Sequence, residues 1–315
     1  MIGDFLAFLA ASSVVERYVE VKDSLGNSKE FKNITEVKKS YDSYISNPSE
    51  FTIESCQRNK KNYLNSAKAI IKNKIRLFAS ATNCKEVLIV MGGPTNFRND
   101  LPLFSKYKDR VDSFRPSCLK EIRDMLEEMY PTEYSEHCEA DDLISMYQYL
   151  GYKTKQHIVV VAVDKDAKQT PGLLYNPMSN VLQDCSGFGK IFLKEKSNGT
   201  KKLEGYGRLW FYSQVCCGDP VDTYNPFVGK ANNITDLKFY NMFKDFTTDE
   251  ECWKQVAALY KNAYGNLDSW VTWNGTIQKG TWIDILQAYV DVVHMWRWKK
   301  DRIDVPKVLQ KYNII

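Results

Sequence analysis

The stretch HIVVVAVDKD, at residues 157–166, is an apolar run that ends in two aspartates separated by one lysine. An earlier run, KEVLIVMGG at 85–93, is equally rich in valine and isoleucine and ends in two glycines. Neither run alternates apolar with polar residues, which is typical of strands buried on both faces of a parallel sheet. The two runs therefore predict two parallel strands.

Helical patterns accompany these runs. A charged segment at 117–130, SCLKEIRDMLEEMY, lies between them, and a further helix is expected over 139–150 with Gly151 as its C-cap. The order of strand, helix and strand predicts an α/β fold with a mainly parallel central sheet flanked by helices. Ligand chemistry in such sheets gathers beyond the carboxyl ends of the strands, where Asp164 and Asp166 lie.

Composition sets wide bounds. The chain has 315 residues, of which 43% are apolar and 26% charged, and its net charge is +4. These values are typical of a globular protein with one large domain or a core and an appended lobe. So small a net charge neither indicates nor excludes nucleic acid as a partner, so the distribution of charge has to decide.

The cysteines and the hydropathy of the sequence indicate where in the cell the protein is expected. The eight cysteines form no C-x-x-C pair, and only three histidines could complete a zinc site. Scattered cysteines are typical of a reducing compartment, so we expect a cytoplasmic protein. No apolar run approaches the roughly 18 residues of a membrane span, and the segment 5–15 lacks the basic residues of a signal peptide. We therefore expect a soluble protein that is not associated with a membrane.

Changes in pattern suggest the domain organisation. The segment 20–62 is polar with charges of both signs, and we expect a surface insertion of short helices and loops. After about residue 205 the sequence becomes helical and aromatic, as in TWIDILQAYVDVVHMWRWKKDR. The prediction is an α/β domain over 1–204, including a basic segment at about 97–136, followed by a helical C-terminal lobe over 205–315.

Acidic residues gather at three places, which are Glu139, Asp141 and Asp142 at the head of a helix, Asp164 and Asp166 after a strand, and Asp219 and Asp222 before a turn-rich segment. Each group alone has an ordinary explanation as helix caps, loop decoration or turn formers. Together they contain no histidine, and oxygen ligands of this kind select Mg²⁺ or Mn²⁺ over zinc. So many carboxylates exceed the needs of one ion. Two ions that clamp the oxygens of a phosphodiester displacement are the better fit.

Six stretches, in chain order, resemble the flap endonuclease and 5′→3′ exonuclease family of PIN-like, structure-specific nucleases. They are GDFLAFLAASSVVE at 3–16, FRNDLPLFSKYKDRVDSFRP at 97–116, CEADDLISMY at 138–147, VVAVDKDAKQTPG at 160–172, CCGDPVDTYNPFVGKANN at 216–233 and LQAYVDVVHMWRWKKDRIDVP at 286–306. The resemblance covers nearly the whole chain. The last stretch is similar to the tail of bacteriophage members of the family.

The resemblance implies a metal-dependent 5′→3′ exonuclease or flap endonuclease that hydrolyses DNA and RNA primers during phage DNA replication in the host cytoplasm. Its partners would be DNA with 5′ ends, flaps or a single-stranded arm, RNA–DNA hybrids and replication proteins. One metal ion would be held or oriented by Glu139, Asp141, Asp142 and Asp164, and the other by Asp166, Asp219 and Asp222. Metal-bound water would then attack the phosphorus, so no side-chain nucleophile is needed.

Basic residues cluster between the two strands with aromatic residues interleaved, and such a run is typical of a solvated helix face. The resemblance implies instead an arch beneath which the 5′ strand passes. Lys108 and Arg110 would stabilise charge at the scissile phosphate. The residues expected to bind substrate are Arg98, Lys106 and Arg115 in the arch, and Gly229 and Lys230 in a helix–turn–helix type motif of the C-terminal lobe. The interleaved aromatic residues, which could stack on unpaired bases, are Phe97, Phe104, Tyr107 and Phe114.

Two departures from the family leave alternatives open. The family's first strand ends in a metal-ligating aspartate, and here Ile2 stands at that position. The loop after Asp222 keeps only Gly229 of the glycine pair that accompanies a K⁺ site in the family. One alternative is therefore a catalytically impaired DNA-binding relative with a structural or replication accessory role. Another takes the D-x-D as a phosphatase or sugar-transferase signature, but Lys168 stands where aspartyl-phosphate phosphatases have Thr or Val.

Overall fold

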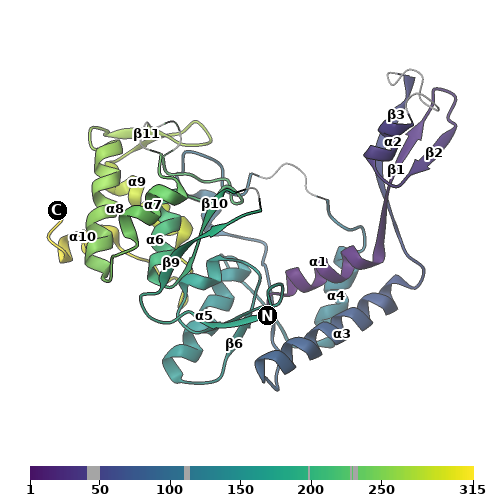
Figure 1. Cartoon of the computed structure of the whole chain (residues 1–315), viewed down its shortest axis with the longest axis horizontal. Coiled ribbons are helices and arrows are strands. Elements are labelled where there is room, and N and C mark those ends of the chain that lie inside the picture. Colours follow the sequence, from purple (N-terminus) through teal and green to yellow (C-terminus); the bar gives the residue numbers. More distant parts are fainter. Residues whose placement is uncertain (41–49, 110–113, 198, 228, 230–232) are drawn as a thin grey trace. The chain divides into compact units, whose positions relative to one another are not determined.

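The computed structural model describes residues 1–40, 50–109, 114–197, 199–227, 229 and 233–315. Its contacts divide the chain into two compact units. The small unit consists of residues 3–77 and 114–131, and the large unit of residues 1–2, 78–113 and 132–315. Figure 1 labels their helices and strands along the chain.

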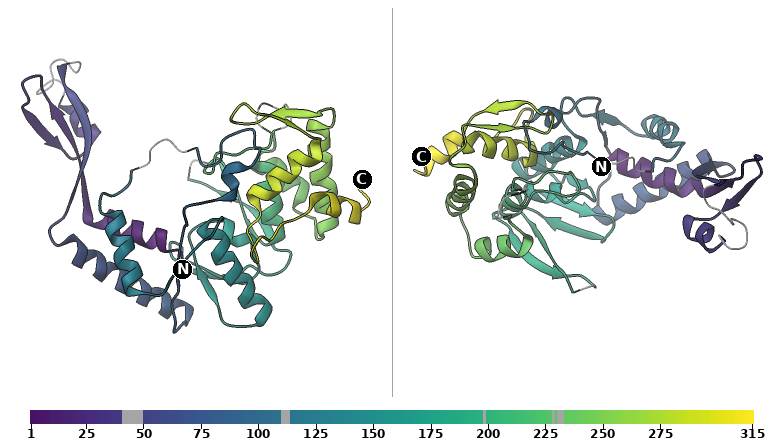
Figure 2. Two further views of the ribbon diagram at one scale, coloured as in Figure 1. Left: turned by 180° about the vertical axis from the view of Figure 1, so that it is seen from behind. Right: turned by 90° about the horizontal axis from the view of Figure 1, so that it is seen from above.

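The small unit contains an antiparallel sheet and several helices. Strand β1 is central and pairs with β3 along its whole length and with β2 from Val19 to Lys22. Figure 2 shows the three strands as a narrow twisted ribbon. The elements are α1 (Gly3–Val14), β1 (Val15–Lys22), β2 (Ser28–Phe31), α2 (Ile34–Lys39), β3 (Thr52–Asn59), α3 (Tyr63–Thr82) and α4 (Leu119–Met129).

This sheet corrects the expectation of short helices and loops over 20–62. Its apolar cluster is small, built on Val19, Val21, Phe31 and Val37, so most side chains of the strands remain polar. Cross-strand ion pairs replace apolar contacts on the exposed face, where Arg58 lies 3.0 Å from a carboxylate oxygen of Glu30. A polar composition therefore hid the strands. Residues 41–49 lie outside the described part of the chain.

The strands of the large unit are short and form several small sheets. Strand β4 pairs in parallel with β5, β6 pairs in parallel with β7, and β8 is antiparallel to β7. The hairpins β9–β10 and β11–β12 are antiparallel. These strands are β4 (Ile89–Met91), β5 (Thr132–Tyr134), β6 (Val159–Val161), β7 (Leu173–Asn176), β8 (Val181–Asp184), β9 (Lys190–Glu195), β10 (Lys201–Tyr206), β11 (Ser269–Val271) and β12 (Ile277–Lys279).

The first two residues lie between the strands that the apolar runs predicted. The amide of Val90 in β4 donates to the carbonyl of Met1 at 2.8 Å, and the amide of Ile2 donates to the carbonyl of Val161 in β6 at 3.3 Å. Ile2 also forms a parallel bridge with Val90. The backbone of Met1 and Ile2 thus connects β4 to β6, although each strand is only three residues long.

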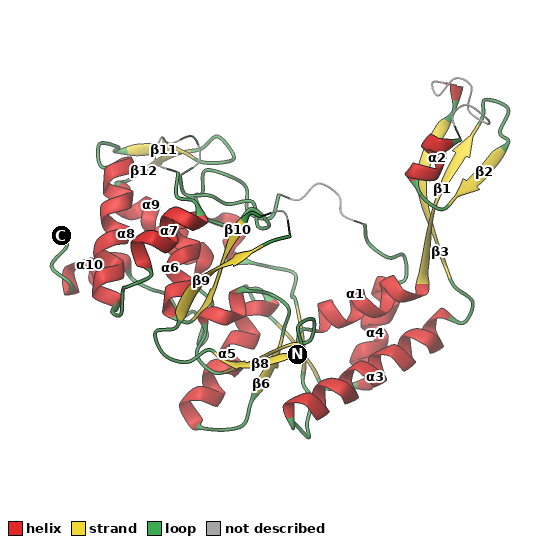
Figure 3. Cartoon of the chain, viewed as in Figure 1, coloured by secondary structure: helices red, strands yellow, loops and turns green. Residues whose placement is uncertain are grey.

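Three helices of the large unit, α7, α8 and α9, pack around α6. Every residue of α6 from Leu209 to Cys216 is buried, as expected for a helix covered on all sides, and Figure 3 shows α7, α8 and α9 beside it. The helices are α5 (Ala140–Thr154), α6 (Arg208–Cys217), α7 (Asp236–Phe243), α8 (Asp249–Tyr264), α9 (Trp282–Val293) and α10 (Val305–Lys311), with short 3₁₀ turns η2 (Phe97–Asp100) and η3 (Asp166–Gln169).

Helix α5 corrects the predicted C-cap. It continues through Gly151 to Thr154, and Lys155 takes the left-handed conformation with φ +60°. Gly151 is required by packing instead, because a Cβ atom at that position would lie 2.9 Å from the Cβ of Ile158. The glycine therefore permits a close approach of the chain to the helix rather than ending it.

The predicted domain boundary at 204 stays a prediction. In the division by contacts, residues 132–315 all belong to the large unit. The segment at 97–136 that was expected to form one arch is shared between the two units. All eight cysteines are free thiols. Among the described helices, none combines the length and the apolar character needed to cross a membrane.

Candidate metal centre

Three carboxylates from two distant segments meet inside the large unit. One oxygen each of Asp166, Asp219 and Asp222 lies within 4.8 Å of the others. The three residues are 8%, 2% and 6% exposed. Like charges so close and so poorly hydrated repel strongly unless a cation lies among them. This cluster could hold a metal ion.

The loop after α6 is shaped to present two of these carboxylates. Asp219 and Tyr224 form an isolated antiparallel bridge with N–H···O distances of 2.8 and 3.2 Å. The amide of Val221 donates to Oδ1 of Asp219 at 2.9 Å, which tightens the turn. Thr223 has φ +60°, a conformation that a β-branched side chain rarely adopts. The strained residue closes a tight loop with Asp219 and Asp222 on it.

Asp166 is held from the other side. It begins the turn η3 a short loop after the end of β6, and its amide donates to Oδ1 of Asp164 at 2.9 Å. Gln214 of α6 donates its amide Nε2 to Oδ1 of Asp166, and Gln169 donates to Gln214 at 3.2 Å. Burial, and then the charge of Asp164, raise the pKa of Asp166 to about 8. Without a cation, this carboxyl therefore keeps its proton at neutral pH.

The head of α5 brings a second acidic group. Glu139 is the N-cap residue, and its carboxylate accepts from Asn96 Nδ2 at 3.0 Å, Tyr107 Oη at 2.9 Å and Lys108 Nζ at 2.6 Å. The hydroxyl of Tyr107 also lies 3.5 Å from Oδ2 of Asp222. Tyr107 therefore connects the acids of α5 to the buried cluster.

Asp141 has a buried carboxylate oxygen, Oδ1, that no hydrogen bond satisfies within the described residues. Burial raises the pKa of Asp141 well above the ordinary aspartate range, and the charges of Asp164 and Glu139 raise it further. Buried polar oxygens are nearly always satisfied in proteins. A hard divalent cation is the partner that the donor set fits.

The position of Arg98 corrects one prediction, and its partner is Asp142, whose metal role stays a prediction. Arg98 has no exposed surface, and its guanidinium contacts both carboxylate oxygens of Asp142 at 2.5 and 2.9 Å. Asp142 also accepts from the amides of Glu139 and Trp296. Arg98 is therefore a buried partner rather than a substrate-binding side chain, and the oxygens of Asp142 are engaged as the anchor of the α5 cap.

Two lysines act as counterions in the centre. Nζ of Lys108 lies 2.6 Å from Glu139, and Nζ of Lys165 lies 2.8 Å from Asp219. Burial acts to lower the pKa of each lysine, but the surrounding carboxylates outweigh it and raise both pKa values. Lys165 was not predicted as a site residue. Its position between the two aspartates of the D-x-D was the available signal.

The segment that carries Lys108 is fastened to the acidic loop. The amide of Lys108 donates to the carbonyl of Asp222 at 2.9 Å, and Ser105 Oγ donates to the carbonyl of Thr223 at 2.6 Å. Thr223 in turn donates its hydroxyl to the carbonyl of Lys106 at 2.7 Å. Lys108 itself has φ +51°. These bonds hold the backbone around Lys108 against the acidic loop, so its side chain lies beside the acids. Nothing in the local sequence predicted these bonds.

Other predicted residues lie elsewhere. Lys106 and Gly229 are exposed in the large unit and Arg115 is exposed in the small unit, and their roles stay predictions. Arg110 and Lys230 lie outside the described residues.

The aromatic residues of the predicted arch all pack against other side chains. Phe97 stacks on Trp296 with ring centroids 5.0 Å apart, and Tyr107 is buried. Phe104 packs against two tyrosines of the large unit, and Arg17 lies 4.1 Å above the ring of Phe114 in the small unit.

No family model matches this chain, and no curated protein sequence matches it either. Some solved structures are similar. The flap endonuclease of bacteriophage T5, in a pseudo-enzyme–product complex with DNA and metal ions, is 13% identical with a TM-score of 0.47, over 78% of this chain and 88% of that one. The T5 5′-exonuclease with bound zinc is 14% identical with a TM-score of 0.46, over 77% and 87% of the two chains. At this level of similarity neither structure assigns an activity to this protein.

Proposed function

We propose that this protein is a divalent-metal-dependent 5′ nuclease that hydrolyses phosphodiester bonds of DNA. The observation that carries the proposal is the buried cluster of Asp166, Asp219 and Asp222, with oxygens within 4.8 Å of one another. Such a dense set of acids destabilises a metal-free protein, so its value lies in binding cations. The order of the acidic motifs in the sequence supports the choice of reaction.

The chain's own residues have distinct roles in this proposal. Asp166, Asp219 and Asp222 would hold one Mg²⁺ or Mn²⁺, while Asp141, Asp164 and Glu139 would serve a second. When bound, the ions supply Lewis acidity and an activated water, so the chain needs no side-chain nucleophile. Lys108 would place a positive charge beside the scissile phosphate, where negative charge develops in the transition state.

The finer assignments rest on the sequence resemblance. They are action on 5′ ends, flaps and RNA primers, a role in phage DNA replication, a cytoplasmic location and contacts with replication proteins. The family's K⁺ site would depend on Gly229, which is exposed with φ +70°.

A second candidate is a DNA-binding protein that does not cleave. Ile2 favours it, because this residue lies between β4 and β6, where the family's first strand would supply an aspartate, and contributes no carboxylate. The centre would then lack one metal ligand.

The deciding experiment measures cleavage of 5′-labelled flap, nicked and duplex DNA with Mg²⁺ or Mn²⁺, and with a chelator. We expect metal-dependent release of short 5′ products, at least 100-fold slower in Asp219→Asn, since a lost metal ligand removes several kcal/mol of transition-state stabilisation. Asp304→Asn, at the N-cap of α10, is the matched control and should cleave normally. DNA binding with no cleavage of any substrate would select the second candidate, and hydrolysis of small phosphate esters alone would select a phosphatase.

A further inference from the structure

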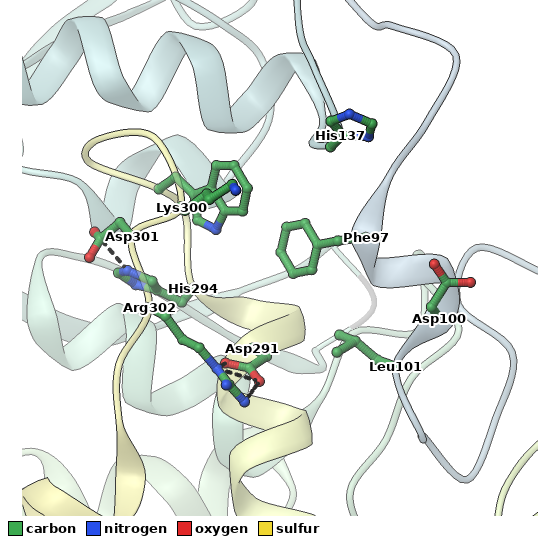
Figure 4. Close-up of a pocket in the computed structure, with 10 residues that line it drawn as sticks. Phe97, Asp100, Leu101, His137, Asp291, His294, Lys300, Asp301 and Arg302 are labelled. Atoms are coloured by element: carbon green, nitrogen blue, oxygen red, sulfur yellow. Dashed lines mark hydrogen bonds and ion pairs between the residues drawn. The ribbon is translucent and has the colours of Figure 1, made fainter.

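A second site is suggested by a pocket beside η2 in the large unit. Its volume is about 580 Å³, within the range of sites for small molecules. It is lined by the end of α9, the loop that follows α9 and the turn η2 (Figure 4). It shares no lining residue with the carboxylate cluster. Any ligand would therefore bind apart from the metal centre.

The wall of this pocket is aromatic. The rings of Phe97 and Trp296 stack with centroids 5.0 Å apart and planes inclined by 10°. Leu101 extends the apolar surface. Phe97 and Trp296 are both partly exposed, so the stacked pair can receive a further planar ring. Stacking of a base on an aromatic side chain contributes about 1–3 kcal/mol.

The polar rim is largely engaged in internal ion pairs. His294 lies 2.9 Å from Asp301, and Arg302 lies 2.7 Å from Asp291 (Figure 4). Asp301 is 2% exposed. Arg297 also pairs with Asp301 at 2.7 Å, so an arginine neutralises each of the two carboxylates, Asp291 and Asp301. The lining side chains outside these pairs, which include Lys300 and His137, therefore determine which ligand is favoured.

Two of those side chains are placed to donate hydrogen bonds to an anion. Lys300 is exposed and has φ +60°, and it precedes the anchored Asp301. His137 is also exposed with φ +56°, and its Nδ1 lies 3.1 Å from Thr95 Oγ1. Residues held in this region of backbone space are uncommon and gather at functional sites. Figure 4 shows Lys300 and His137 on either side of the Phe97 ring.

We propose that this pocket binds one nucleotide unit, with its base against Phe97 and Trp296 and its phosphate at Lys300 and His137. An aromatic wall beside an exposed lysine fits a planar base joined to an anion, and a lysine ammonium is a common phosphate contact. Asp100, which also lines the pocket, offers an acceptor for an amino or hydroxyl group. The unit can be a free nucleotide or one nucleotide of a strand.

An occupied pocket would contact the metal centre indirectly. The amide of Trp296 donates to Oδ1 of Asp142 at 3.1 Å, and Phe97 is the neighbour of Arg98 in the chain. Asp142 in turn accepts from the amide of Glu139. Movement of Trp296 or Phe97 would therefore shift Asp142 and, through it, the start of α5, where the second acidic group lies.

The test measures binding of dAMP, deoxyadenosine and inorganic phosphate to the full chain by calorimetry in a chelator. The chelator keeps metal-bound phosphate out of the measurement, so the result does not depend on nuclease activity. We expect dAMP to bind with a Kd of roughly 1 mM or tighter, and at least about tenfold more tightly than deoxyadenosine or phosphate. Lys300→Ala should weaken dAMP about tenfold, which corresponds to one charged contact.

Two further variants sharpen the result. Lys299→Ala removes the adjacent lysine, which pairs with Glu136 at 2.9 Å and does not line the pocket, and it should leave dAMP affinity within about twofold. Phe97→Leu keeps an apolar wall but removes the stacking ring, and it should weaken dAMP and deoxyadenosine alike. The proposal is overturned if dAMP does not bind, if phosphate binds equally well, or if Lys300→Ala and Phe97→Leu, both shown to be folded by circular dichroism, bind like the native protein.

A last measurement distinguishes a free nucleotide from one nucleotide of a strand as the ligand. A short single-stranded oligonucleotide that binds at least about tenfold more tightly than dAMP, and loses that advantage in Lys300→Ala but not in Lys299→Ala, would show that the pocket takes a nucleotide of a strand. Equal affinities of dAMP and the oligonucleotide, both sensitive to Lys300→Ala, would show that the free nucleotide is the ligand.

Discussion

Arg98 and Asp142 form an ion pair in which neither side chain has any exposed surface. The guanidinium also donates to the carbonyls of Val292 and His294 at 2.8 and 2.9 Å. The pair therefore ties the end of α9 to the head of α5. It fixes the start of α5, where Glu139 and Asp141 lie.

Breaking this pair should destabilise the protein strongly. Arg98→Met leaves the Asp142 carboxylate buried without its partner, and we expect the free energy of unfolding in urea to fall by about 3–5 kcal/mol. The double variant Arg98→Met/Asp142→Leu removes both charges and should recover much of that loss. Arg123→Met, at a half-exposed pair with Asp4 in the small unit, should cost about 1 kcal/mol or less. A double variant no more stable than Arg98→Met alone would contradict the explanation.

Asp166 should make the metal-free protein less stable as pH rises. Its pKa in the folded protein is about 8, against an ordinary value of 3.8. Between these values the folded state binds a proton that the unfolded state has released, so the free energy of unfolding falls as pH rises through the window. Asp166→Asn cannot ionise and escapes this loss.

Urea unfolding in a chelator at several pH values checks this. The native protein and Asp166→Asn should differ little near pH 4, and the variant should be the more stable at pH 8, each unit of pKa shift being worth about 1.4 kcal/mol. Mn²⁺ should stabilise the native protein by mass action and stabilise the variant less. A difference between the two proteins that does not change with pH would refute the assignment.

Lys165 should compete with divalent ions. Its ammonium lies 2.8 Å from Asp219, so an ion bound by that carboxylate has to displace it. We expect Lys165→Met to bind Mn²⁺ several-fold more tightly in the absence of DNA, measured by calorimetry. Lys307→Met removes a lysine that pairs with Asp304 at 2.8 Å on α10, and it should bind Mn²⁺ like the native protein. Weaker Mn²⁺ binding by Lys165→Met would show that the lysine organises the site rather than blocking it.

The sequence predicted the elements that carry a strong local signal. The valine-rich runs coincide with β4 and β6, and the acids of α5 begin the helix at Glu139 as expected. The spacing of Asp219 and Asp222 marked a turn, and the structure brings both to Asp166. Their service as metal ligands stays a prediction.

Contacts between residues that are far apart in the chain could not be predicted from local sequence patterns. Asp142 was grouped with the metal ligands because it lies three residues from Glu139, whereas its partner Arg98 lies 44 residues earlier in the chain. Gly151 was interpreted as a cap because the approach of Ile158 cannot be read from the sequence. The β1–β3 sheet was missed because ion pairs, not apolar alternation, cover much of its surface.

Lys108 offers the sharpest test of chemistry against binding. Its ammonium lies 2.6 Å from Glu139, and its own amide donates to the carbonyl of Asp222. If it acts on the transition state, Lys108→Ala should slow single-turnover cleavage of flap DNA by about 100-fold or more, while DNA affinity in Ca²⁺ changes less than about threefold. Lys106→Ala, at an exposed lysine paired with Asp109, should lower affinity slightly and leave the single-turnover rate at saturating DNA unchanged. Equal losses of rate and affinity in Lys108→Ala would mean that the ammonium binds the DNA backbone in the ground state as strongly as in the transition state, and contributes nothing specific to bond cleavage.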